Sequence, residues 1–166
     1  SGFDGIAEVW FEDMESMRAN VDTPELKAIR RDEENFIDSN SMGTILTNEY
    51  VIKEAESVVV DQKLMALVNR LEHNDAATFH SIYRDQLGPL VAAVPNIHRY
   101  VQAHTRSGIY RTNRQPAYDA VASLWFAEVD ALVSSPEMHA VRELEHAILD
   151  FDRTRIGAVE EIEITL

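Results

Sequence analysis

A stretch of nine residues occurs twice in this chain, and the repeat constrains the fold more than any other feature. The first copy runs from Phe3 to Phe11, as FDGIAEVWF, and the second from Tyr118 to Phe126, as YDAVASLWF. Both copies have the length and alternation of a β-strand. The residues that follow each copy are also related, so that residues 3–43 correspond to residues 118–157. We therefore interpret the chain as built from two related parts.

A period of two predicts which face of each repeated strand meets a helix. Ala120 and Ala122 lie on one face of the second copy, and small residues there let a helix approach closely. The opposite face carries Trp10 in the first copy and Trp125 in the second. A bare sheet that exposes tryptophans to water is unusual, so we expect this face to meet a second layer or a cavity.

The order of the predicted elements indicates an α+β fold. From Lys63 onward we predict strands over residues 63–71, 97–104, 118–126 and 155–165, one helix that begins at Asn74 or Asp75, and one over residues 136–151. This β-α-β-β-α-β order is the ferredoxin-like split βαβ arrangement, an antiparallel sheet with both helices on one face.

The earlier part of the chain predicts only half of such a unit. A strand over residues 5–11 precedes a helix with Thr23 as its N-cap and Pro24 at its first position, and a strand over residues 42–52 follows. We therefore predict three parts: residues 1–53 as the second half of a first unit, residues 54–62 as a connector, and residues 63–166 as a complete second unit. We expect the other half of the first unit to precede residue 1 or to come from another chain.

Composition excludes several classes of partner and chemistry. The 166 residues are 45% hydrophobic, which suits one ordinary domain with a sizeable core, and they carry a net charge of -14. That charge argues against nucleic acids and anionic membranes as partners. The chain has no cysteine, which excludes disulfides and thiolate chemistry, and no apolar run long enough for a membrane span. We expect a cytoplasmic protein.

Three stretches together carry a resemblance to a known family. They are FHSIYRDQLGPLV at residues 79–91, RYVQAH at residues 99–104 and the second copy of the repeated strand. In this order they resemble the EthD family of dimeric α+β barrel proteins, in particular its longer members with two units in one chain. The resemblance implies two ferredoxin-like sheets packed face to face and a mostly apolar pocket between sheet and helices. Relatives include small-molecule degradation proteins, lactone isomerases, polyketide cyclases, and cofactor-free or haem-dependent oxygenases.

Two residues depart from the family pattern. The family's histidine before the Gly/Ala-Pro-Leu motif falls on Leu87. The glutamate of its Ala-Glu-x-Trp-Phe strand falls on Ser123 in the second part but is present as Glu8 in the first. The resemblance therefore implies that the second part has lost two functional residues and that the helix expected to hold the first part's histidine lies outside this sequence.

Glu8 is the strongest candidate for a catalytic residue. Alternation puts Glu8 beside Trp10 on the predicted cavity face, where desolvation raises a carboxyl pKa and suits it to general acid or base catalysis. The alternative is that Glu8 pairs with a basic side chain across an interface and only fixes geometry.

A row of polar side chains is predicted on one face of the strand over residues 97–104. His98, Tyr100, Gln102 and His104 alternate there. Such a row suits the lining of a wet pocket, in which histidines exchange protons near neutral pH, but it also suits a sheet edge or a subunit interface. We take Tyr100 and His104 as candidate ligand contacts.

Four further side chains are candidate ligand contacts. His80 and Tyr83 lie three residues apart on the predicted first helix and could line the pocket; the alternative places Tyr83 in the core and His80 on the surface. Trp10 and Trp125 could stack on a planar ligand or simply pack against neighbouring side chains.

The predicted function follows mainly from the resemblance. We expect binding of a small apolar or aromatic carbonyl compound, with transformation by proton transfer or cofactor-free oxidation. The alternatives are a non-catalytic small-ligand-binding or assembly module and a haem-binding protein with His80 or His104 as axial ligand, so whether the protein is an enzyme stays open. No histidines or carboxylates have the spacing of a metal site, and we expect neither metal nor cofactor. Sheets covered on one side only must bury the other, which predicts a homodimer.

Overall fold

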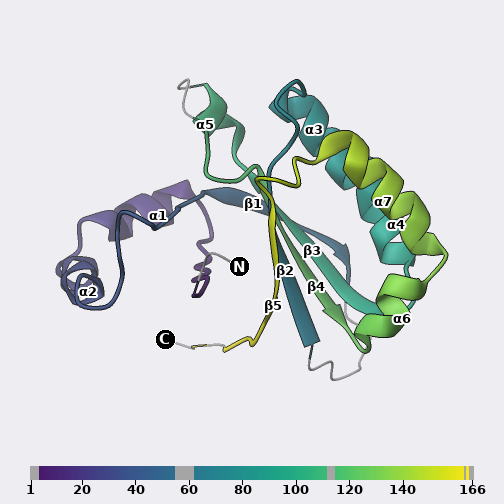
Figure 1. Cartoon of the computed structure of the whole chain (residues 1–166). Coiled ribbons are helices and arrows are strands. Elements are labelled where there is room, and N and C mark those ends of the chain that lie inside the picture. Colours follow the sequence, from purple (N-terminus) through teal and green to yellow (C-terminus); the bar gives the residue numbers. More distant parts are fainter. Residues whose placement is uncertain (1–3, 55–61, 112–114, 163, 165–166) are drawn as a thin grey trace. The chain divides into compact units, whose positions relative to one another are not determined.

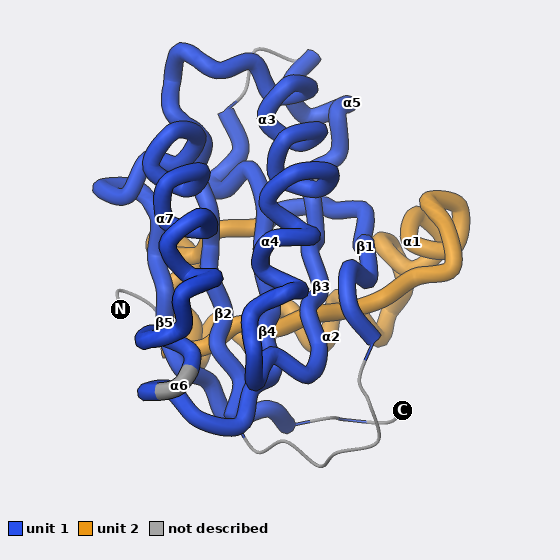
Figure 2. The backbone as a smooth tube through the Cα atoms, turned by 90° about the vertical axis from the view of Figure 1, so that its right-hand side faces the viewer, with its two compact units in different colours: residues 1, 45–166 blue, residues 2–44 orange. Residues whose placement is uncertain are grey.

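The computed structural model describes residues 4–54, 62–111, 115–162 and 164. Residues 45–166 form one compact unit and residues 2–44 form a second, shown in different colours in Figure 2. The boundary falls inside the strand that we predicted over residues 42–52 and just before the strand that forms, Thr47–Lys53. The assignment of those residues to half of a further ferredoxin-like unit stays a prediction.

The smaller unit contains two capped helices. Helix α1 is Met14–Val21, and the Asp13 carboxylate caps it by accepting a hydrogen bond from the Ser16 amide at 2.7 Å. Helix α2 is Pro24–Glu33. The Thr23 hydroxyl accepts from the Leu26 amide at 3.2 Å, which confirms the predicted N-cap and the proline at the first helical position.

The strand predicted over residues 5–11 is absent, and these residues form neither strand nor helix. Its counterpart in the second copy forms strand β4, Ala120–Phe126. This strand is hydrogen-bonded along both edges, by β2 (Gln62–Val68) and by β3 (Ile97–Thr105). A strand needs such partners, because its amides and carbonyls cannot bond within the segment. The described part of the smaller unit contains no strand that could pair with residues 5–11. The alternating pattern is therefore not sufficient for a strand here.

The larger unit is built on a five-stranded sheet in the order β1-β3-β4-β2-β5, in which every neighbouring pair is antiparallel. The strands are β1 Thr47–Lys53, β2 Gln62–Val68, β3 Ile97–Thr105, β4 and β5 Arg155–Val159. From β2 to β5 the chain follows the ferredoxin-like β-α-β-β-α-β path, as predicted. Strand β1 adds a fifth strand beside β3.

Helices cover one face of this sheet (Figure 1). Between β2 and β3 lie α3 Ala76–Ile82, a π-helical turn η1 Tyr83–Leu87 and α4 Gly88–Ala93. The short helix α5, Ser107–Tyr110, follows β3, and α6 Val129–Ser134 and α7 Glu137–Ile148 follow β4. Asp75 caps α3 through the Thr78 amide at 2.9 Å, as predicted.

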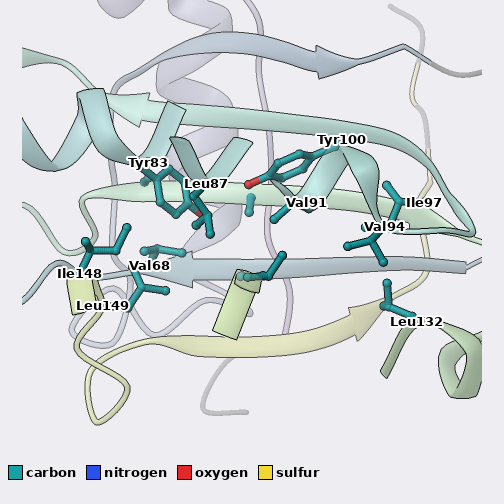
Figure 3. Packing of buried hydrophobic residues seen from close by; sticks show 14 of the residues in the cluster. Val68, Tyr83, Leu87, Val91, Val94, Ile97, Tyr100, Leu132, Ile148 and Leu149 are labelled. Carbon is teal, nitrogen blue, oxygen red and sulfur yellow. The ribbon is translucent and has the colours of Figure 1, made fainter. Parts of the chain in front are cut away.

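The hydrophobic core lies between these helices and the sheet (Figure 3). Ala120 and Ala122 are 0% and 3% exposed there, which confirms that the small side chains of β4 face the helices. Phe79, Tyr83 and Leu87 from the first helical segment pack against them, and helix α7 adds Val141 and Ile148. Burying this apolar surface is the main source of the unit's stability.

The π-helical turn brings the backbone of η1 close to the sheet. Its last hydrogen bond runs from the Gly88 amide to the Tyr83 carbonyl, one residue further back than in an α-helix. Pro89 follows without an amide hydrogen, so the helix is interrupted but does not end, and it continues as α4. A Cβ atom on Gly88 would lie 3.3 Å from Ile52 Cγ2 on β1 and 3.6 Å from Gln102 Nε2 on β3.

Replacing Gly88 with leucine is therefore expected to lower the free energy of unfolding by about 1–3 kcal/mol through overpacking. Gly108 on α5 is a matched control, because nothing lies within 4 Å of the position of its added Cβ. The Gly108→Leu variant should change the free energy of unfolding by no more than about 0.5 kcal/mol. Urea denaturation of both variants measures the difference, and equal losses would show that the approach at Gly88 is not tight.

Candidate functional site

Aromatic side chains from five elements meet where β3 ends and β4 begins. We call Tyr50, His80, Tyr83, His104 and Tyr110 the histidine cluster. They come from β1, α3, η1, β3 and α5, so the cluster lies on the helix-covered face of the sheet.

His104 is the centre of the histidine cluster. Its ring centroid lies 4.8 Å from that of His80, 4.9 Å from that of Tyr50 and 5.7 Å from that of Tyr83. The Tyr110 ring contacts His80 edge-on at 5.9 Å. His104 is only 4% exposed, whereas His80, Tyr50 and Tyr110 are half-buried. The cluster thus combines a buried histidine, His104, with three partly exposed rings, which we call its rim.

The hydrogen bond of His80 defines which of its nitrogens carries the proton. Nε2 lies 2.9 Å from the backbone carbonyl oxygen of Asp119. A carbonyl only accepts, so Nε2 must donate, and in the neutral ring Nδ1 then carries the lone pair. His80 is therefore arranged as a base through Nδ1.

The same reasoning applies to His104, by way of Gln102. The Gln102 amide nitrogen donates to the Tyr83 carbonyl at 2.9 Å and contacts the Tyr100 hydroxyl at 2.7 Å. The amide oxygen is therefore the atom that lies 2.9 Å from His104 Nε2, and that nitrogen must donate. His104 also carries its lone pair on Nδ1.

Burial keeps both histidines neutral. Desolvation lowers the pKa of His104 to about 3, and the neighbouring His80 and Arg84 contribute to the lowering, while Asp85 acts in the opposite direction. Desolvation also lowers the pKa of His80, in opposition to its hydrogen bond with the Asp119 carbonyl. At neutral pH both rings are proton acceptors.

A buried ion pair holds the edge of the site. The Asp119 carboxylate accepts from the Arg70 guanidinium at 2.5 Å, from the Arg70 amide at 2.9 Å and from the Tyr110 hydroxyl at 2.7 Å. Its backbone carbonyl accepts from the Thr105 amide as well as from His80. Asp119 therefore connects α3, α5 and the ends of β2, β3 and β4.

A second polar group lies deeper, on the side of α7. The Tyr83 and Tyr100 hydroxyls are hydrogen-bond partners within the core, and burial raises the pKa of each. Glu145 on α7 is half-buried, and desolvation raises the pKa of its carboxyl group. Gln102 thus connects this group to the histidine cluster.

Comparison with known families decides the classification. The chain matches the EthD domain family over residues 1–40 and 72–151. It belongs to the EthD family. The matched ranges include α3, η1, β3 and α5, which carry four of the five residues of the histidine cluster.

Solved structures with a similar fold are distant in sequence. A hypothetical protein of Arabidopsis thaliana aligns with 69% of this chain and 96% of its own, at 13% identity and a TM-score of 0.45. A protein of Lactobacillus acidophilus NCFM, provisionally described as a monooxygenase, aligns with 89% of this chain and 65% of its own, at 12% identity and a TM-score of 0.48. No curated protein matches the chain.

The structure of this EthD-family protein brings four of the predicted ligand contacts together. His80, Tyr83, Tyr100 and His104 all lie on the helix-covered face, where we expected a pocket, a sheet edge or an interface. Tyr83 is buried in the core, whereas His80 is half-buried and contacts His104 rather than lying on the surface alone. His98 does not join this row, because β3 has an irregular register between Ile97 and Arg99.

Trp125 lies apart from these residues, on the opposite face of the sheet. Its indole nitrogen donates to Glu161 at 3.0 Å, and the cations of Lys63 and Arg99 each lie 4.5 Å from its ring. Lys63 also pairs with Glu161 at 2.6 Å. Trp125 therefore does not share a site with His104.

Glu8 and Trp10 belong to the smaller unit, in the irregular segment before α1. Their roles as catalytic acid/base and ligand contact stay predictions. Leu87, where the family pattern has histidine, is 1% exposed and packs in the core.

Sequence reasoning missed several residues of the site. Asp119 occupies the same place in the second copy of the repeated stretch as Asp4 does in the first, and this repetition is a signal that it could have a specific role. Nothing in the sequence paired it with Arg70 or Tyr110, because those contacts depend on where three strands end. Tyr50 and Glu145 were likewise missed.

Among the residues that the structure describes, no three histidine, aspartate or glutamate side chains are grouped to hold a metal ion. A haem iron bound to Nε2 of His80 or His104 would require that nitrogen to give up its hydrogen bond, to the Asp119 carbonyl or to Gln102 respectively.

None of the described helices is both long and apolar enough to cross a membrane.

Proposed function

We propose that this protein binds a small apolar or aromatic carbonyl compound at the histidine cluster and catalyses a proton transfer, with His80 Nδ1 as the general base. One observation carries the proposal: His80 donates from Nε2 to the Asp119 carbonyl, which leaves Nδ1 as a lone pair on a half-buried ring. Histidine is the side chain most often used as a general base.

The surroundings of His80 support an apolar, planar ligand. Tyr50 and Tyr110 are half-buried beside the two histidines and present aromatic surface on which a flat ring can stack. Both histidines are neutral near pH 7, because burial lowers their pKa, so the rim favours an uncharged compound. Proton abstraction next to a carbonyl group is the reaction this arrangement suits best, with cofactor-free oxidation of the resulting carbanion by molecular oxygen as an extension.

The alternative is a non-catalytic ligand-binding or assembly module. The burial of Leu87 in the core favours it, because no proton-transferring group stands where the family pattern has histidine. A proton-exchange experiment separates the enzyme from the binding module, because a binding module holds the compound without accelerating the exchange of its protons.

We also propose a homodimer that buries the sheet face opposite the helices. Val51, which pairs with Val101 on that face, is 43% exposed, and an apolar sheet face is stabilised by a second layer that covers it. A catalytic role for Glu8 and a cytoplasmic location stay predictions.

Exchange of the α-protons of 2-tetralone in D₂O, followed by ¹H NMR, tests the function directly. The wild-type protein should accelerate the exchange, and His80→Gln should reduce the acceleration roughly 100- to 10,000-fold. Glutamine keeps an N–H group for the Asp119 carbonyl but has no basic nitrogen, so the loss reports on the base rather than on the fold.

His139→Gln is the matched control, because His139 is 81% exposed on α7 and is not part of the histidine cluster. It should leave the exchange rate unchanged. Binding of 2-tetralone, measured by saturation-transfer NMR, without faster exchange in the wild type would favour the binding module. Equal exchange by wild type and His80→Gln would remove His80 as the base.

A further inference from the structure

The position of Gln102 connects the irregular helix to the histidine cluster. Gln102 is 0% exposed in the middle of β3, between Tyr100 and His104 on the same face. An amide side chain buried this completely must have its hydrogen bonds satisfied. Both polar atoms of the Gln102 amide, Nε2 and Oε1, have hydrogen-bond partners. Its orientation is therefore determined by its surroundings.

The π-helical turn supplies the contact that orients Gln102. The Tyr83 carbonyl accepts from the Gly88 amide within the turn and from the Gln102 amide nitrogen outside it. Gly88 lies beside this contact, because a Cβ atom at its position would be 3.6 Å from Gln102 Nε2, an ordinary van der Waals distance. If the amide were reversed, its oxygen would face a carbonyl oxygen, which only accepts.

We propose that Gln102 is a positioning residue, which the π-helical turn orients so that its amide oxygen holds His104 as the Nε2–H tautomer beneath His80. The catalytic consequence rests on the proposed function, since it concerns the ring that packs against the proposed base. The structural part is independent of it: with Gln102 fixed, His104 cannot move its proton to Nδ1 without leaving the Gln102 oxygen unsatisfied.

Histidine side-chain NMR tests this inference without a substrate. Long-range ¹H–¹⁵N correlation spectra distinguish a protonated, pyrrole-like nitrogen from a pyridine-like one. In the wild type at pH 7, His104 should show a pyrrole-like Nε2 and a pyridine-like Nδ1. A pyrrole-like Nδ1, a mixture of tautomers or an imidazolium ring would overturn the inference.

Two variants test whether Gln102 is the cause. Gln102→Leu removes the acceptor and should convert His104 to a mixture of tautomers, while Gln86→Leu, at an exposed position on η1, should leave the spectrum unchanged. An unchanged His104 in a folded Gln102→Leu variant would contradict the inference.

Gln102→Met keeps the length of the side chain if the leucine variant fails to fold. Methionine has neither the amide N–H group that donates to the Tyr83 carbonyl nor the amide oxygen that accepts from His104. His104 should therefore again show a mixture of tautomers. An unchanged Nε2–H tautomer in the folded methionine variant would contradict the inference. A wild-type Nε2–H tautomer together with no exchange of 2-tetralone protons would leave the role of Gln102 intact and reject the proposed function.

Discussion

Replacing Asp119 with alanine is expected to lower the free energy of unfolding by about 3–5 kcal/mol, because it leaves a buried cation without its partner. Asp119 is 1% exposed, and its carboxylate accepts from both the side chain and the amide of Arg70 and from Tyr110. Alanine would leave these three donors without an acceptor in a region where the Arg70 side chain is only 13% exposed.

The exposed pair of Arg84 and Asp85 provides the matched control. Its ionic groups are 2.7 Å apart, but the side chains are 39% and 51% exposed. Water already solvates such a pair, so Asp85→Ala should lower the free energy of unfolding far less than Asp119→Ala does. Urea denaturation monitored by circular dichroism measures both variants. Similar losses for Asp119→Ala and Asp85→Ala would contradict the buried network around the histidine cluster.

Acidification from pH 7 to pH 4 is expected to remove about 3 kcal/mol of stability through His104 alone. Its pKa is lowered to about 3 in the folded protein, from an ordinary value of 6.5. Between these values the unfolded chain binds more protons than the folded protein does, so stability falls as the pH falls. The contribution is fully present above pH 6.5 and is lost progressively toward pH 3. His80 acts in the same direction, because its pKa is also lowered.

Comparison of His104→Phe with His139→Gln separates this effect from the titration of carboxylates. The phenylalanine variant should show a shallower dependence of unfolding free energy on pH between pH 6.5 and pH 4. The His139→Gln variant should follow the wild type, because His139 is exposed. Parallel curves for all three proteins would show that folding does not lower the pKa of His104.

Local chemistry made much of the fold predictable. Thr23 and Asp75 predict the starts of their helices, because their side chains accept hydrogen bonds from amides that have no partner within the first helical turn. The alternation in the second repeat correctly gave the face on which Ala120 and Ala122 meet the helices. Alternation along residues 97–104 likewise placed Tyr100 and His104 on one face of β3, where Gln102 contacts both.

The parts that could not be predicted depend on contacts between distant segments. Residues 5–11 have the pattern of β4 but lack strands beside them in the described smaller unit, so the pattern does not become a strand. The irregular register near Arg99 moves His98 out of the polar row, and periodicity alone cannot show such a shift. The pairing of Asp119 with Arg70 depends on the register of β2 against β4.

A crystal structure of the protein soaked with 2-tetralone tests the central claim most directly. We predict that the ring of the compound lies against His80 and Tyr110, on the helix-covered face of the sheet, with its α-carbon beside His80 Nδ1. A compound bound only beside Trp125 on the opposite face, or away from both faces, would contradict the assignment of the histidine cluster as the functional site.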